Sequence, residues 1–140
     1  EGLTTPNGIA WSPDGTAMYL AETRARTLRR FAFDAATGTL DEGAVFATLT
    51  DDEGKPDDAM VAADGSYWVA GITAGKLVGF GPDGSRVGEI GIGPEMVTMP
   101  CLGGAGHDRL FVSSLTLGDV PGGIWAAPTR LKGRAAYRFG

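Results

Sequence analysis

The chain has 140 residues, of which 43% are hydrophobic and 21% are charged, and its net charge is −5. This charge weighs against nucleic acid or an anionic membrane surface as a partner. The one cysteine excludes an intrachain disulfide framework. No apolar run is long enough to span a membrane. The content of 23 glycines and 8 prolines indicates many tight turns and short strands.

Three stretches of the chain share one order of elements, which indicates an internal repeat. Each begins with a short apolar strand, passes through a polar turn into a stronger strand, and adds a loop and a further strand. The first stretch covers residues 6–34 and the second covers 56–84, whereas the third is looser. The equivalent aromatic residues Tyr19, Trp68 and Phe111 are 49 and 43 residues apart. Spacings of this size are typical of propeller blades.

The repeat predicts an all-β fold, a β-propeller of which about three four-stranded blades are present. We expect the blades at residues 6–50, 51–94 and 95–140. The predicted strands are 8–12, 17–22, 28–34, 43–48, 57–62, 66–71, 76–81, 86–91, 97–102, 109–114, 123–127 and 134–138.

Large apolar side chains are expected to fill the space between neighbouring blades. Trp11, Trp68 and Trp125 are predicted to be core residues there, because burial of a large aromatic side chain is strongly stabilising. Cys101 is expected to be a small buried residue, since a free cysteine usually behaves as a small hydrophobe.

Three blades do not close a ring, because propellers have about four to eight blades. Residues 1–140 are therefore predicted to form a partial propeller domain, and the chain begins at Glu1 rather than Met. We expect missing N-terminal blades or a second copy to complete the ring, and we favour the missing blades. We also expect a cytoplasmic location, with a signal peptide ahead of Glu1 as the open alternative.

Two polar residues occupy matching places in the first two repeats. Asn7 follows Pro6 and Asp57 follows Pro56, and each stands just before an apolar strand. They are 50 residues apart, about one repeat, so both are expected at the mouths of neighbouring inner strands and directed toward the propeller axis. An amide oxygen and a carboxylate suit a hard divalent cation. Two ligands do not complete a metal site, so further ligands would come from missing blades or from water.

The local sequence also allows simpler interpretations. Asn followed by Gly is typical of a turn, which would make Asn7 a turn residue. Asp57 and Asp58 follow the acidic residues 51–53, and the whole stretch is also typical of a solvated acidic loop. The residues alone leave both interpretations open.

The strings PNGIAWSPDGTAMYLAET, GKPDDAMVAADGSYWVA, KLVGFGPDG and RLFVSS resemble the C-terminal half of the SMP-30/gluconolactonase/luciferin-regenerating family. The match runs in order over nearly the whole chain. The resemblance implies a six-bladed β-propeller with one divalent metal ion in the central channel, often calcium or zinc, with magnesium or manganese as further candidates. It also implies that about three blades lie outside this chain.

The resemblance implies divalent-metal-dependent hydrolysis of a lactone, typically a sugar lactone, as the small-molecule substrate. The family's metal-binding Asn matches Asn7, and its Asp, both a metal ligand and the proposed general base, matches Asp57. Asp58 stands where most relatives have Gly. The family's N-terminal metal-binding Glu has no match here, so we expect the chain alone to be inactive.

Two other functions stay open at this stage. A propeller can serve as a non-catalytic binding scaffold, because its loops present a surface to partners. Relatives of the fold also act on phosphotriesters or on other lactones. The decisive observation is the distance between the Asn7 and Asp57 side chains, since a shared cation requires that they lie together.

Overall fold

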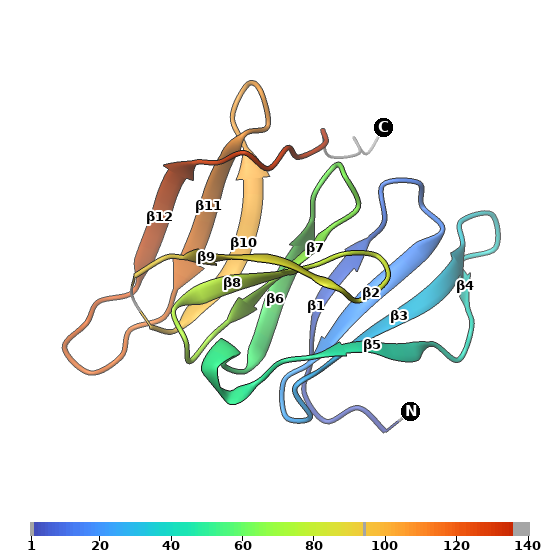
Figure 1. Cartoon of the computed structure of the whole chain (residues 1–140), viewed down its shortest axis with the longest axis horizontal. Coiled ribbons are helices and arrows are strands. Elements are labelled where there is room, and N and C mark those ends of the chain that lie inside the picture. The colour runs from blue at the N-terminus through green and yellow to red at the C-terminus, as the bar shows by residue number, and fades with distance from the viewer. Residues whose placement is uncertain (1, 94, 136–140) are drawn as a thin grey trace.

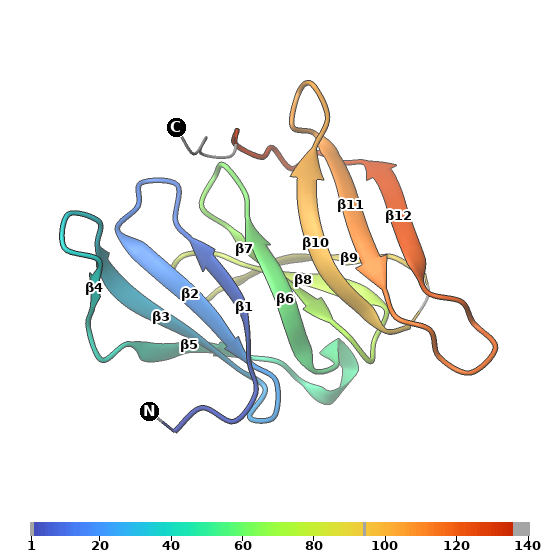
Figure 2. The ribbon, with the colours of Figure 1, turned by 180° about the vertical axis from the view of Figure 1, so that it is seen from behind.

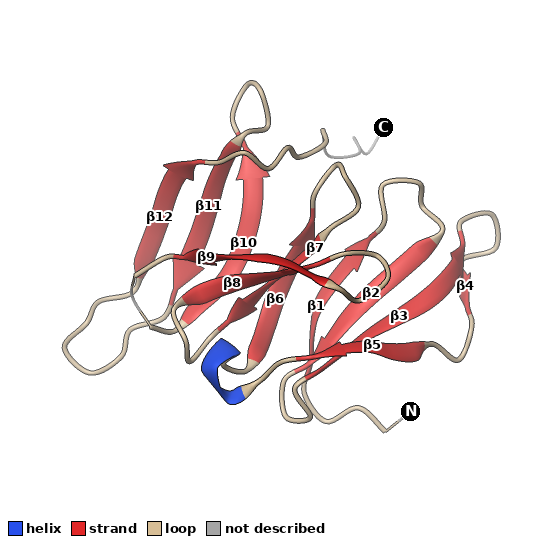
Figure 3. Cartoon of the chain, in the orientation of Figure 1, coloured by secondary structure: helices blue, strands red, loops and turns tan. Residues whose placement is uncertain are grey.

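The computed structural model describes residues 2–93 and 95–135. These residues form three antiparallel sheets and contain no α-helix (Figure 1). A short 3-10 turn, η1 (Asp51–Glu53), lies between the first two sheets (Figure 3). The first sheet holds β1 (Pro6–Trp11), β2 (Ala17–Glu22), β3 (Thr27–Asp34), β4 (Thr39–Leu40) and β5 (Ala44–Thr48). The second holds β6 (Pro56–Val61), β7 (Tyr67–Gly71), β8 (Lys76–Phe80) and β9 (Arg86–Gly91), and the third holds β10 (Val97–Gly103), β11 (Arg109–Ser114) and β12 (Gly123–Pro128).

The predicted all-β class is confirmed, and eleven of the twelve predicted strands lie within a few residues of their expected bounds. The structure adds the short strand β4, which pairs with β3 where the sequence predicts only a turn. The predicted strand at 134–138 lies mostly outside the described residues, and Arg134 and Ala135 belong to no strand. The division into blades stays a prediction.

The core consists of two apolar clusters, one on each face of the second sheet. The first cluster joins β2 to β7 and includes Tyr19, Tyr67 and Phe80. The second joins β7 to β10 and β11 and includes Trp68 and Val112. Because both faces of the second sheet are covered, β7 is buried along its whole length, which explains its unbroken apolar sequence YWVAG.

The exposure of two tryptophans corrects the prediction of a tryptophan core. Trp68 is buried as expected, but Trp11 is 48% exposed and Trp125 is 44% exposed. Trp11 lies on the face of the first sheet opposite Ala10, which packs on the core. Cys101 is exposed as well, so its expected burial is wrong.

The strands that begin the three sheets, β1, β6 and β10, lie side by side and run in the same direction (Figure 2). Each has one extra residue relative to its antiparallel partner near its start. Such a β-bulge locally redirects the side chains beside it. The three bulges therefore repeat one backbone shape near the starts of β1, β6 and β10.

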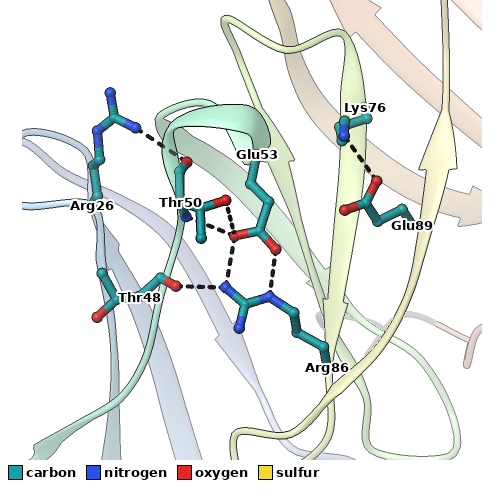
Figure 4. A network of polar contacts seen from close by, with 7 residues as sticks. All are labelled: Arg26, Thr48, Thr50, Glu53, Lys76, Arg86 and Glu89. Carbon is teal, nitrogen blue, oxygen red and sulfur yellow. Dashed lines mark hydrogen bonds and ion pairs between the residues drawn. The ribbon is translucent and has the colours of Figure 1, made fainter.

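A polar network connects the first two sheets at η1 (Figure 4). The Arg86 guanidinium donates two hydrogen bonds to the Glu53 carboxylate, at 2.5 and 2.7 Å, and one at 3.0 Å to the backbone oxygen of Thr48. Glu53 is buried and also accepts bonds from the backbone and side chain of Thr50. The hydrogen bonds from Arg86 outweigh burial and lower the pKa of Glu53 to about 2. This network positions the link that leads into β6.

Candidate functional site

Asn7 and Asp57 contact each other directly. Each is the second residue of its inner strand, Asn7 in β1 and Asp57 in β6. The Asn7 Nδ2 donates to Asp57 Oδ1 at 2.8 Å and to Thr23 Oγ1 at 2.9 Å. The structure thus brings together the two residues that the sequence selected 50 positions apart, and it does so across two separate sheets.

The bulges explain how two side chains from different sheets meet. In β1 the extra residue falls between Asn7 and Ala10, and in β6 it falls between Pro56 and Ala59. Gly8 takes the left-handed conformation with φ of 59°, which favours glycine. Asp58, the matching residue of β6, has a negative φ. The chain therefore carries Asp at this position without backbone strain.

Asp57 is a half-buried carboxylate with a neighbouring negative charge. Burial raises the pKa of Asp57, and the charge of Asp58 raises it further. Both effects disfavour the ionised form of the carboxylate, so a proton or a cation at this position would be stabilising. A perturbed carboxylate with a specific partner is also a frequent feature of functional sites.

The Asn7 amide and the Asp57 carboxylate are the kinds of group that bind a hard divalent cation. Rotation of the Asn7 amide by 180° would place its oxygen where Nδ2 now lies, so that amide and carboxylate oxygens would face one point. The set is incomplete in number, because residues 2–93 and 95–135 contain no group of three or more His, Cys, Asp or Glu that could hold a metal ion. Asn7 and Asp57 by themselves therefore do not complete a metal site.

The third sheet has the same bulge but different chemistry. Thr98 and Met99 stand at the place of Asn7 and Gly8. The Thr98 Oγ1 lies 2.7 Å from the Ser113 Oγ, which also accepts the Met99 backbone N–H at 3.2 Å. Neither Thr98 nor Met99 brings a carboxylate to this position.

Sequence reasoning missed two residues that support the pair. Thr23 follows β2 and accepts a bond from Asn7, and its backbone N–H bonds the Thr5 oxygen. Tyr67 in β7 donates its hydroxyl to the Gly8 carbonyl at 2.7 Å. Alignment of the repeats could have found Thr23, because it follows the strand that pairs with β1. Nothing local marks Tyr67, which lies 59 residues from Gly8.

The cavities of the described structure lie away from the pair. One of about 260 Å³ is apolar and lies between the second and third sheets, lined by Ile90, Leu110 and Trp125 among others. Another of about 530 Å³ lies beside Trp11 and Arg134. Neither cavity is lined by Asn7 or Asp57, and both of these residues are partly exposed.

Comparison with known proteins decides the family. The family described as "SMP-30/Gluconolactonase/LRE-like region" matches residues 1–116. The chain belongs to this family. The resemblance inferred from the sequence is therefore confirmed.

Relatives in the family carry lactonase names. The pentonolactonase XacC of Haloferax volcanii is 29% identical over 98% of this chain and 52% of its own length. The L-arabinolactonase of Azospirillum brasilense is 34% identical over 95% of this chain and 46% of its own. The solved structure of the calcium-binding protein regucalcin from Agrobacterium tumefaciens has a TM-score of 0.86 at 29% identity, and covers 94% of this chain and 48% of that one. The chain spans about half the length of these relatives.

Across the part of the chain that the structure describes, no helix has the length and apolar character needed to cross a membrane.

Proposed function

We propose that this chain provides one half of a divalent-metal-dependent lactonase that hydrolyses a sugar lactone. The observation that carries the proposal is the 2.8 Å contact between Asn7 and Asp57 at the starts of adjacent inner strands. The names of the pentonolactonase and L-arabinolactonase relatives support a pentonolactone as substrate, and the name of a gluconolactonase structure from Xanthomonas campestris supports gluconolactone.

Each residue has a defined part in the proposed reaction. Asn7 and Asp57 bind the cation, for which calcium or zinc is proposed, with magnesium and manganese as further candidates. A cation held by these residues would supply positive charge to stabilise the oxyanion that forms on the lactone carbonyl oxygen. Asp57 accepts a proton from the attacking water. The ring C–O bond then breaks, and the ring oxygen takes up a proton to give the hydroxy acid.

The rest of the ligand shell and ring comes from outside this chain in our proposal. The outward faces of the first and third sheets expose apolar side chains, with Ile9 53% exposed and Ile124 80% exposed. Further blades or a second copy would cover these faces and complete a six-bladed ring. The incomplete shell leads us to expect no lactonase activity from the chain as a monomer. A cytoplasmic location stays a prediction.

The test compares the longer protein that contains this chain with its Asp57→Ala and Asn7→Ala variants. Hydrolysis of gluconolactone and of a pentonolactone is followed with calcium or zinc present and after chelation. We expect chelation and Asp57→Ala each to lower kcat/KM by at least about a hundredfold, since both remove the stabilisation of the transition state. Retained activity in Asp57→Ala would overturn the assigned role. Absence of hydrolysis with any lactone would favour the non-catalytic scaffold.

A further inference from the structure

Gly8 lies at a close contact between the first two sheets, and it directly follows Asn7. A Cβ added at Gly8 would meet the Tyr67 hydroxyl at 2.5 Å, the Asp57 backbone oxygen at 2.9 Å and the Ala21 Cβ at 3.0 Å. Movement of the Gly8 peptide would therefore change the position of Asn7 relative to Asp57. The question is which group keeps the peptide in place.

Tyr67 bonds the Gly8 carbonyl from the second sheet. Its hydroxyl donates at 2.7 Å, and the bond is buried. The ring of Tyr67 is itself fully buried, with the ring of Tyr19 at 5.2 Å and that of Phe46 at 6.0 Å between centroids. Because these neighbours leave the ring no room to turn away, the hydroxyl is a donor with a fixed position.

The backbone N–H of Gly8, which belongs to the preceding peptide group, has a weaker contact. The Gly8 N–H points to Asp58 Oδ1 at 3.4 Å, which is long for a hydrogen bond. Burial raises the pKa of Tyr67, and the negative charge of Asp58 raises it further, so the hydroxyl keeps its proton and stays a donor. Of these two contacts, the bond from Tyr67 is the shorter, so it is the stronger restraint on the backbone of Gly8.

The third sheet provides an internal comparison. Its bulge is held by Ser113, which belongs to the neighbouring strand of the same sheet. The bulge at Gly8 is instead held by a side chain of the adjacent sheet. Of the two bulges, the one beside the polar pair is thus tied across the sheet junction that this pair bridges.

From this geometry we infer that Tyr67 is a positioning residue of the site. Its hydroxyl holds the Gly8 peptide so that the Asn7 amide faces the Asp57 carboxylate. Tyr67 itself does not contact cation or substrate in this assignment. The inference rests on the proposed function, because it gives Tyr67 a task in that same site.

The test uses NMR spectra of the 140-residue chain with Tyr67→Phe, which keeps the ring and removes only the hydroxyl. In the metal-free protein we expect the Asn7 side-chain NH₂ signals to move toward those of a free amide. Tyr19→Phe is the matched control, because it removes a hydroxyl from the neighbouring ring and should leave these signals in place. Unchanged Asn7 signals in folded Tyr67→Phe would overturn the inference.

A second measurement needs no variant. In the wild-type chain, the Tyr67 hydroxyl proton should exchange slowly with water and show a nuclear Overhauser contact to the Gly8 region. A hydroxyl proton that exchanges quickly and has no such contact would overturn the inference even if Tyr67→Phe did not fold.

A titration with calcium chloride separates this inference from the proposed function. The titration uses the longer protein that contains this chain, because the proposed ligand shell is complete only there. We expect its Asn7 signals to respond to calcium in the wild type, and Tyr67→Phe to require roughly tenfold more calcium, as for other residues that orient metal ligands. An equal calcium requirement in the two proteins would count against the positioning role. If wild type and Asp57→Ala respond alike, the proposed metal site fails, whereas the metal-free spectra still decide whether Tyr67 positions Asn7.

Discussion

The two junctions between sheets are built differently. The junction of the first and second sheets has polar ties at two places, the Asn7–Asp57 and Tyr67–Gly8 bonds at the inner strands and the Arg86–Thr48 bond at the outer strands. The junction of the second and third sheets has an apolar core with a cavity of about 260 Å³. The hydrogen bonds at its ends, from the Met96 N–H to the Ile72 oxygen and from the Ala63 N–H to the Lys132 oxygen, join backbone groups rather than side chains. Apolar packing suffices to hold two sheets together, whereas directional bonds between them define where individual side chains lie. The first junction is therefore the one suited to hold a functional pair.

The largest expected effect comes from breaking the first junction at its centre. Tyr67→Ala removes a fully buried ring and its bond to Gly8, so we expect a loss of about 3–5 kcal/mol in the free energy of unfolding. Urea denaturation followed by circular dichroism measures it. A loss below about 1 kcal/mol would show that this ring does not support the junction.

The bond from Arg86 to Thr48 at the outer strands is tested through Glu53→Gln. This change weakens the pair between Glu53 and Arg86, which holds the Arg86 side chain in place. We expect a loss of about 1–3 kcal/mol at neutral pH, because the bonds to Glu53 are charge-assisted and Glu53 is buried. The control is Glu89→Gln, which affects the exposed pair with Lys76 shown in Figure 4 and should cost less than about 1 kcal/mol.

Glu53→Gln also tests how the free energy of unfolding depends on pH. The pKa of Glu53 is lowered from 4.5 to about 2 in the folded chain, so its stabilising contribution is complete above pH 4.5 and disappears as the pH falls toward 2. The stability difference between wild type and Glu53→Gln should therefore shrink over this range. A constant difference down to pH 2 would contradict the assignment.

A smaller effect is expected in the third sheet. Ser113→Ala removes the hydroxyl that holds the bulge at Thr98 and Met99, at a cost of about 0.5–1.5 kcal/mol. Because this bulge is tied within its own sheet, the Asn7 side-chain NMR signals should not move. Movement of those signals would show that the two bulges are coupled.

The smallest effect is expected from filling the cavity between the second and third sheets. Ala127 lines the apolar cavity on β12, and Ala127→Val adds apolar volume and a residue that favours strands. We expect a gain of about 0.5 kcal/mol in thermal unfolding experiments. A clear loss would mean that the neighbouring side chains cannot accommodate the added methyl groups.

The strands, the candidate pair and the family could be predicted from the amino-acid sequence. Strand alternation and turn residues depend on neighbouring positions, so most strands lie close to their expected bounds. The repeat also singled out Asn7 and Asp57, because equivalent positions of a repeat occupy equivalent places in space. Family membership followed from strings of residues that the matching family covers.

Burial and long-range contact were decided by the tertiary structure alone. Trp68 is covered on the second sheet while Trp11 and Trp125 are partly exposed, and no local pattern separates these three tryptophans. The bond from Tyr67 to Gly8 joins residues 59 positions apart on different sheets. The sequence by itself thus determined the strands and the two residues of the candidate site, because these depend on local pattern and repeat spacing. Only the packing of sheet on sheet determined which side chains hold that pair in place, because such contacts exist only once separate sheets have come together.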